Sequence, residues 1–211
     1  MYLSDGSILV PRVSREQTDN NRIAITDASA RLFRERGIDN VSVAELMAAA
    51  GLTHGGFYGH FESKDELAAE ACRWAFGRSA ERWKKRVAEK SDRSLARAAL
   101  TDRYLSAQAR SNPGASCPAA AFAGDVARES ADAPVRAAYA AGVEELLKVL
   151  ASVQETDMPH GDREGALADL ATMVGGLILA RATEGKPISD EFLTAARRRL
   201  KPRKRPRSSG Y

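Results

Sequence analysis

The sequence predicts an all-α protein with a three-helix N-terminal domain and a larger C-terminal helical bundle. Alanine, a strong helix former, is very frequent, whereas glycine and proline lie mostly between stretches of periodic hydrophobicity. Within those stretches apolar residues recur at three- and four-residue spacing, which places them on one face of a helix. Hydrophobic residues make up 44% and charged residues 28% of the chain, a balance typical of a globular protein.

We divide the chain into an N-terminal arm (1–13), a small domain (14–67), a larger domain (68–200) and a basic tail (201–211). The arm shows no hydrophobic period. The net charge of +4 does not indicate a basic folded face, because the segment that spans the last helix end and the tail is strongly basic and the rest of the chain is net acidic. The basic residues of that segment are Arg197, Arg198, Arg199, Lys201, Arg203, Lys204, Arg205 and Arg207.

Three helices are expected in the small domain. The first starts at Ser14 or Asn21 and ends at Gly37, since both starts suit a helix N-terminus and glycine suits the position after a helix end. The second starts at Ser42, where Glu45 completes the spacing of a capping box. The third runs from about 53 to 60, after a turn that contains a glycine.

Six further helices are expected in the larger domain. Their hydrophobic stripes and caps predict the ranges 63–90, 94–111, 118–130, 133–155, 162–184 and 189–200. The clearest interruption is the loop 111–116, which contains Asn, Pro and Gly.

Two short helices joined by a tight turn, with a third that supports them, have the organisation of a helix-turn-helix. Such a unit inserts its second helix into the major groove of DNA, where base edges present a readable pattern of donors and acceptors. Spacing alone does not separate this function from an ordinary helical bundle, because bundles also contain short helices and glycine turns.

The residues of the small domain closely resemble the signature of the TetR family of transcriptional regulators. The resemblance lies in ASARLFRERG at 28–37, VSVAEL at 41–46, AGLTHGGFYGHF at 50–61 and SKDEL at 63–67. It covers about residues 21–67, and the remainder is similar to the family only in length and number of helices. The resemblance implies an N-terminal helix-turn-helix DNA-binding domain and a C-terminal bundle for ligand binding and dimerisation.

By this resemblance, one set of residues faces double-stranded DNA. Tyr58, His60, Lys64 and Ser42 occupy positions where family members touch phosphates, although packing or capping is the alternative for Tyr58 and His60. His54 serves either phosphate contact or base readout. The full set is Ser42, Thr53, His54, Gly55, Gly56, Tyr58, Gly59, His60 and Lys64.

The recognition helix contains three glycines, so it has few side chains with which to read bases. Each glycine weakens an isolated helix by roughly 0.5–1 kcal/mol relative to alanine. We therefore expect the backbone at Gly55, Gly56 and Gly59 to approach DNA closely, and DNA shape to contribute to recognition.

The resemblance also implies a homodimer and a small-molecule effector. The last two long helices carry apolar stripes that serve either a dimer interface or an ordinary core: Leu167, Leu170, Val174, Leu177, Ile178, Phe192 and Leu193. Six large side chains are candidates to line an effector cavity, with packing in the core as the alternative: Trp74, Trp83, Tyr104, Phe122, Tyr139 and Met173. The sequence shows no obvious pair of charged residues that would hold a ligand, so we expect a largely apolar or aromatic effector.

Cys117 is a second candidate sensor. It precedes Pro118 at an expected helix N-terminus, where the helix dipole would lower the pKa of its thiol. The alternative is an incidental small residue at a helix start. Cys72 is expected to pack in a helix interface.

No motif of an enzyme is present: there is no glycine-rich phosphate loop, G-x-S-x-G or H-E-x-x-H sequence. We expect no catalysis, no cofactor and no metal site. The N-terminus lacks a signal peptide and the apolar stretch 173–180 is too short for a bilayer, which favours a cytoplasmic protein without a membrane partner.

The sequence therefore favours a sequence-specific transcriptional regulator, a repressor released from a palindromic operator by a small molecule. Two alternatives remain. One is a repressor that senses oxidants or electrophiles through Cys117. The other is an architectural protein that binds DNA without sequence preference through its basic tail.

Overall fold

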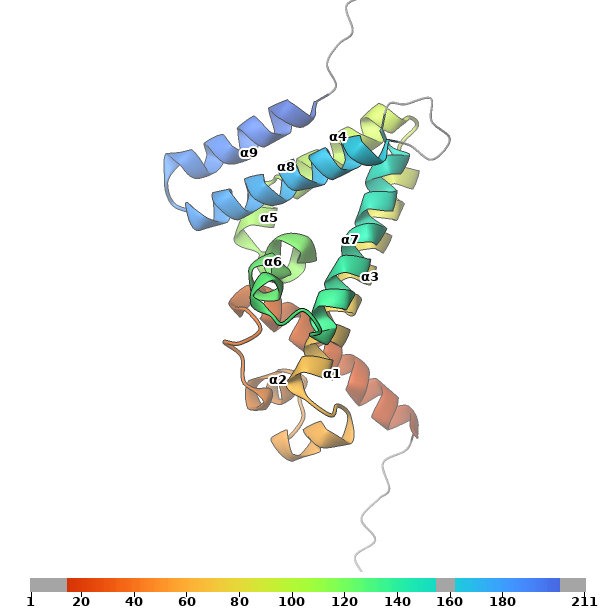
Figure 1. Cartoon of the computed structure of the whole chain (residues 1–211), viewed down its shortest axis with the longest axis vertical. Helices are drawn as coiled ribbons and strands as arrows, with labels where there is room; N and C mark the ends of the chain where they lie inside the picture. Colours follow the sequence, from red (N-terminus) through yellow and green to blue (C-terminus); the bar gives the residue numbers. More distant parts are fainter. Residues whose placement is uncertain (1–14, 155–161, 202–211) are drawn as a thin grey trace, which may run out of the picture.

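A computed structural model of the chain describes residues 15–154 and 162–201. Every regular element in these ranges is a helix. The molecule is elongated, with the small domain at one end and the larger bundle at the other (Figure 1). The all-α class predicted from the sequence is confirmed. The N-terminal arm, and the basic tail after Lys201, lie outside the described residues.

The small domain contains α1 (Arg15–Arg36), α2 (Val43–Ala49) and the 3₁₀ helix η1 (His54–Gly59). Gly37 and Gly51 end the first two helices with φ of +87° and +75°, conformations that side chains disfavour. These three elements pack around a common core made by Ile25, Phe33, Val41, Leu46, Met47, Phe57 and Phe61.

The long helix α3 (Lys64–Ala88) starts beside η1 and extends into the larger domain, where it lies along α7 (Pro134–Ser152) (Figure 1). The contact is close because Gly142 has no side chain, so that the Phe76 ring occupies the space of a β-carbon. The same long helix therefore belongs to both domains.

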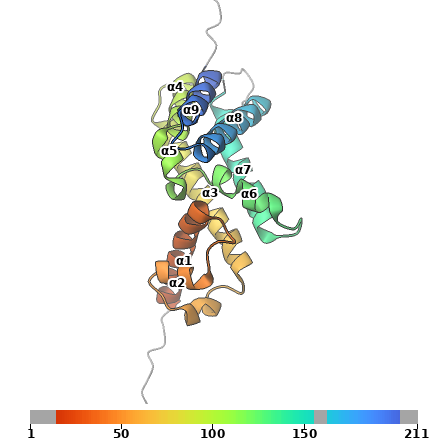
Figure 2. The same ribbon diagram turned by 90° about the vertical axis from the view of Figure 1, so that its left-hand side faces the viewer.

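The larger domain is completed by six more helices. At its far end α9 (Pro187–Leu200) folds back along α8 (Arg163–Ala182), and Figure 2 shows this pair at the opposite end of the molecule from α1 and α2. The elements are α4 (Arg93–Tyr104), α5 (Ala107–Ser111), the 3₁₀ helix η2 (Pro113–Ala115), α6 (Pro118–Arg128), α8 (Arg163–Ala182) and α9 (Pro187–Leu200).

The expectation of one continuous helix over 94–111 is wrong. The chain leaves the helical conformation at Leu105, where φ is −93° and ψ is +35°. Ser106 then caps α5 by accepting a hydrogen bond from the backbone N–H of Ala109. Serine favours such a cap because its hydroxyl satisfies a backbone donor that the first turn of a helix leaves unpaired.

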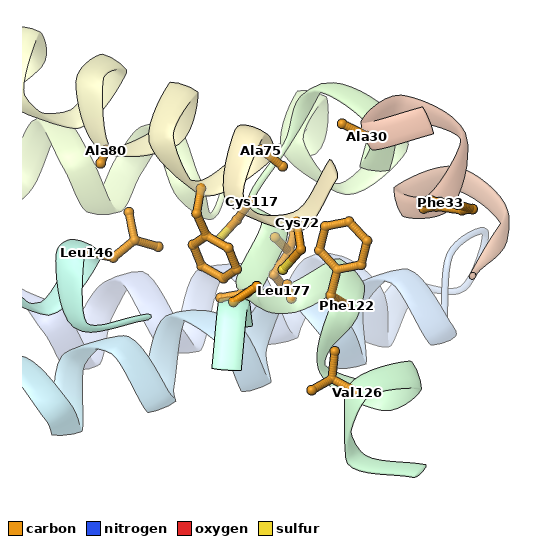
Figure 3. Close-up of a cluster of buried hydrophobic side chains, with 14 of the residues drawn as sticks. Ala30, Phe33, Cys72, Ala75, Ala80, Cys117, Phe122, Val126, Leu146 and Leu177 are labelled. Atoms are coloured by element: carbon orange, nitrogen blue, oxygen red, sulfur yellow. The ribbon is translucent and has the colours of Figure 1, made fainter. Parts of the chain in front are cut away.

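The two domains share one hydrophobic core at their junction. Phe33 of α1, Cys72 of α3 and Phe122 of α6 lie in one cluster of buried side chains (Figure 3). A polar contact joins the domains at the same place, because a carboxylate oxygen of Asp125 in α6 accepts a hydrogen bond of 3.0 Å from the backbone N–H of Ile38. This hydrogen bond links α6 to the segment between α1 and α2.

Candidate nucleic-acid interface

We call residues 53–60 the recognition segment. Phe57 anchors it, since this side chain is buried and its ring lies 5.9 Å from that of Phe61 in a stacked arrangement. Tyr58 points the other way and is 75% exposed. Thr53, His54, Gly55, Gly56 and Gly59 are also exposed, so the structure brings together six of the nine predicted DNA-facing residues on one open surface.

The recognition segment forms the expected third helix, and it is a 3₁₀ helix over His54–Gly59. It is held by short-range bonds, from the N–H of Gly56 to the carbonyl of Thr53 and from the N–H of His60 to the carbonyl of Phe57. A β-carbon at Gly55 or Gly59 would meet no atom within 4 Å, and neither residue has a positive φ. Neither packing nor backbone conformation within the described chain therefore requires glycine at these two positions.

The remaining three predicted residues lie at the edges of this surface. Ser42 is exposed, and it forms the predicted capping box with Glu45. Hydrogen bonds from the backbone N–H and hydroxyl of Ser42 to the Glu45 carboxylate, assisted by Arg36, lower the pKa of that carboxyl to about 2. Lys64 and His60 are half-buried, and the Lys64 Nζ lies 3.5 Å from the carbonyl oxygen of Asp39.

Arg22 positions the recognition segment, and the sequence analysis missed it. Its guanidinium donates a hydrogen bond to the carbonyl of His60, at the end of the segment, and lies 4.1 Å above the Phe61 ring. It also forms ion pairs with Glu66 and Glu70 of α3, and these raise the pKa of Arg22. No sequence signal marks this role, because its partners lie 38 or more residues away.

A cavity of about 450 Å³ lies between α1, α3, α4 and the segment 108–117. Trp83 and Tyr104, two of the six residues predicted to line an effector cavity, form part of its wall. The other four predicted residues do not line it. Phe122 and Met173 are fully buried in the core, the Tyr139 hydroxyl donates to the Ala119 carbonyl at 2.8 Å, and the Trp74 indole N–H donates to Asp27 at 2.8 Å. Six arginines contribute to the wall of this cavity, a feature that the sequence analysis did not anticipate.

The predicted dimer stripe divides into an inner and an outer part. Leu170, Leu177 and Leu193 are buried within the single chain, which favours the core alternative for these three residues. Leu167 and Ile178 are exposed, and Val174 and Phe192 are half-buried. The sequence analysis missed two further exposed apolar side chains on these helices, Leu179 and Ile188.

Cys117 occupies the predicted position at the start of α6, but the expected direction of its pKa shift is wrong. Burial raises the pKa of its thiol, and the Tyr104 hydroxyl and the backbone N–H groups of Ala120 and Ala119 only partly oppose this effect. Burial likewise raises the pKa of Cys72 to about 12. Both cysteines are free thiols inside the core. The described residues contain no group of three or more side chains suited to hold a metal ion.

Comparison with known proteins identifies the small domain. Residues 25–71 match the family described as bacterial regulatory proteins, tetR family. The chain is 36% identical over 59 residues to the HTH-type transcriptional regulator AcrR of Shigella flexneri, in an alignment that covers 28% of this chain and 27% of AcrR. It is 32% identical over 66 residues to the HTH-type transcriptional repressor KstR2 of Mycolicibacterium smegmatis, covering 29% and 32%. The chain thus aligns with only about a quarter to a third of these curated relatives.

Solved structures extend the likeness to the whole fold. A TetR transcriptional regulator from Chloroflexus aurantiacus superposes with a TM-score of 0.70 at 27% identity, covering 88% of this chain and 94% of that one. The reduced form of Escherichia coli NemR superposes with a TM-score of 0.72 at 18% identity, covering 86% and 95%. Fold and site define a helix-turn-helix protein with a C-terminal helical bundle. Residues 25–71 thus form a DNA-binding domain of the tetR family type, and the fold of the whole chain is that of solved TetR transcriptional regulators.

Proposed function

We propose that the chain is a sequence-specific DNA-binding transcriptional regulator, a cytoplasmic homodimer that represses from a palindromic operator until a small molecule releases it. The exposed recognition segment carries this proposal. Its outer residues are exposed, while Phe57, Phe61 and Arg22 fix its inner side. Curated relatives of the small domain are named as HTH-type transcriptional regulators and repressors, which supports the same class.

The bare backbone at Gly55 and Gly59 favours close contact with DNA. An open β-carbon position in a helix is normally better filled by alanine, which stabilises the helix. Glycine at two such positions is explained when another molecule approaches the backbone closely. Around these glycines, His54 and Tyr58 extend outward to contact base edges or phosphates.

An apolar face on α8 and α9 supports the homodimer. Leu167, Val174 and Ile178 recur at helical spacing along the outside of α8, and Ile188 lies on the adjoining helix. In the described part of the chain, α8 is also the single helix long and apolar enough to cross a membrane by length and composition, with 33% of that window buried. Pairing with a second copy would cover this face by two-fold symmetry, which suits a palindromic site.

Release of the protein from its operator by an effector requires that a change in the larger domain move the recognition segment. Two hydrogen bonds connect the domains. The backbone N–H of Ile38, in the turn after α1, donates to Asp125 of α6. Arg34 of α1 donates to the carbonyl of Ser116, in the loop before α6, at 3.1 Å. A shift of α6 would change the separation of the two recognition segments in the dimer. They must match successive major grooves about 34–36 Å apart to bind one operator.

Selection of fragments from a random DNA library by the purified protein tests the proposal. We expect a palindromic consensus with two half-sites, bound more tightly than random DNA by roughly a thousandfold or more. Enrichment without any consensus would contradict a regulator and support an architectural DNA-binding protein instead.

A further inference from the structure

The cavity between the two domains is strongly cationic. Residues from three helices converge on it, two arginines from α1, three from α3 and one from α4. These are Arg31, Arg34, Arg78, Arg82, Arg86 and Arg103. Among the residues that line it, Asp27 is the only acid, and its carboxylate already accepts a hydrogen bond from the Trp74 indole. We call this space the junction cavity.

The positive charge of the junction cavity is largely unneutralised. Arg31 pairs with Glu35 at 3.2 Å, but Arg34 donates only to carbonyl oxygens and Arg103 to the neutral Gln108 and Ser106 side chains. Within the described ranges Arg82 forms no ion pair. Partial burial of its guanidinium, followed by repulsion from Arg78 and Arg103, lowers the pKa of Arg82.

Arg34 shows the energetic consequence most clearly. Burial, followed by repulsion from Arg82, lowers the pKa of Arg34 to about 10. The group still carries its charge at neutral pH, so the folded protein holds two neighbouring guanidinium ions at an unfavourable site. A bound anion would relieve both the desolvation and the repulsion.

The inner wall of the junction cavity is apolar and aromatic. The rings of Trp83 and Tyr104 meet edge to face with 6.0 Å between their centroids, and Leu100 lies beside them. The Tyr104 hydroxyl is buried beside the Cys117 thiol, a weak acceptor, and has no oxygen or nitrogen partner in the part of the chain that the structure describes. A buried hydroxyl without a strong acceptor lowers the stability of the fold unless another group accepts its hydrogen bond.

We propose that the junction cavity binds a small organic anion, whose acidic group lies between Arg34 and Arg82 and whose apolar body packs on Trp83 and Tyr104. Guanidinium groups recognise carboxylate, sulfonate and phosphate oxygens alike through paired N–H donors. A volume of about 450 Å³ falls within the range of small-molecule sites. The proposal deepens the proposed function by naming the chemical class of the effector.

The position of the site explains how such an anion would act on the DNA-binding domain. Arg31 and Arg34 belong to α1, whereas Arg78 and Arg82 belong to the part of α3 inside the bundle. An anion between them attracts both sides and alters the separation of α1 from this part of α3. The recognition segment moves with α1 because Arg22 of that helix is bonded to His60.

Two fluorescent probes of nearly the same shape test this site. 8-Anilinonaphthalene-1-sulfonate carries an anionic group on an aromatic body, and N-phenyl-1-naphthylamine lacks the sulfonate. Each is titrated into wild-type protein, Arg82→Gln, Arg34→Gln, Arg82→Lys and the control Lys85→Gln. Lys85 is an exposed cation on α3 that does not line the junction cavity, so its variant matches the loss of one charge.

We expect the anionic probe to bind wild-type protein and Lys85→Gln alike, at least about tenfold more weakly to Arg82→Gln and Arg34→Gln, and with intermediate affinity to Arg82→Lys. The neutral probe should bind all five proteins equally. Arg82 is only partly buried and is more exposed than Arg34, so Arg82→Gln keeps the test valid even if Arg34→Gln unfolds. Equal affinity of the anionic probe for wild type and Arg82→Gln would overturn the proposal. Since the titration contains no DNA, this failure is distinct from a failure to bind an operator.

Discussion

Alanine at Gly55 or Gly59 should make the protein more stable and a weaker DNA binder. The new β-carbon would meet no atom within 4 Å in the described chain, so it costs nothing in packing. Neither glycine has a positive φ, so alanine fits the backbone without strain. Replacing glycine at a compatible position stabilises a protein by about 0.4–1 kcal/mol, mainly because the unfolded chain loses freedom. In a chain of this size each kcal/mol raises the melting temperature by about 2–4 °C.

The effect on DNA binding should have the opposite sign. If the backbone of the recognition segment lies against DNA, a methyl group at Gly55 or Gly59 pushes it away. Loss of one hydrogen bond to a charged phosphate costs about 1.5–3 kcal/mol, which corresponds to a factor of roughly ten or more in affinity. A homodimer carries the substitution at both half-sites, so the loss applies twice.

Thermal unfolding and fluorescence anisotropy with a selected DNA site measure the two effects separately. Gly77→Ala is the matched control, because Gly77 is exposed on α3 and a β-carbon there also meets nothing within 4 Å. This variant should be stabilised, with unchanged DNA affinity. If Gly55→Ala and Gly59→Ala bind DNA as tightly as Gly77→Ala does, close backbone approach is refuted.

Four further predictions follow from single contacts. Arg22→Ala should lower both thermal stability and DNA affinity, because the carbonyl of His60 and two carboxylates lose their partner; wild-type DNA affinity would contradict a positioning role. Ile178→Glu should yield a folded monomer by sedimentation, and a stable dimer would exclude the outer face of α8. Asp125→Ala should weaken the response of DNA binding to an effector, since the N–H of Ile38 loses its acceptor, whereas an unchanged response would refute coupling through α6. Cys117, with its thiol pKa raised by burial, should remain unmodified by iodoacetamide at pH 8 in the folded protein, as checked by mass spectrometry, and rapid labelling would restore the sensor hypothesis.

Local signals in the sequence were sufficient to predict the positions of most of the helices. Ser42 and Glu45 form a capping box because both partners lie within one turn, and Gly37 and Gly51 end helices through their own backbone conformation. Such features depend on neighbours in the chain, so a single sequence reveals them. The break at Leu105 was missed because its cap, Ser106, lies within an otherwise uninterrupted helical pattern.

Features that depend on distant contacts could not be predicted in the same way. Helix α8 is apolar on more than one side, so periodicity identified its stripe without separating buried Leu170 from exposed Leu167. The arginines of the junction cavity come from three helices and look like ordinary surface charges in the sequence. Arg22 likewise acquires its role only when α1 packs against the end of the recognition segment.

The central claim, that this chain is a regulator which recognises a specific operator as a dimer, is tested most directly by one binding comparison. Fluorescence anisotropy measures the affinity of the purified protein for its selected palindrome and for the same duplex with five base pairs inserted between the half-sites. Five base pairs rotate one half-site by about half a helical turn, so a dimer can no longer place both recognition segments in their grooves. We predict that two chains bind the intact palindrome and that the insertion reduces affinity at least about a hundredfold. Equal affinity for both duplexes would contradict the account.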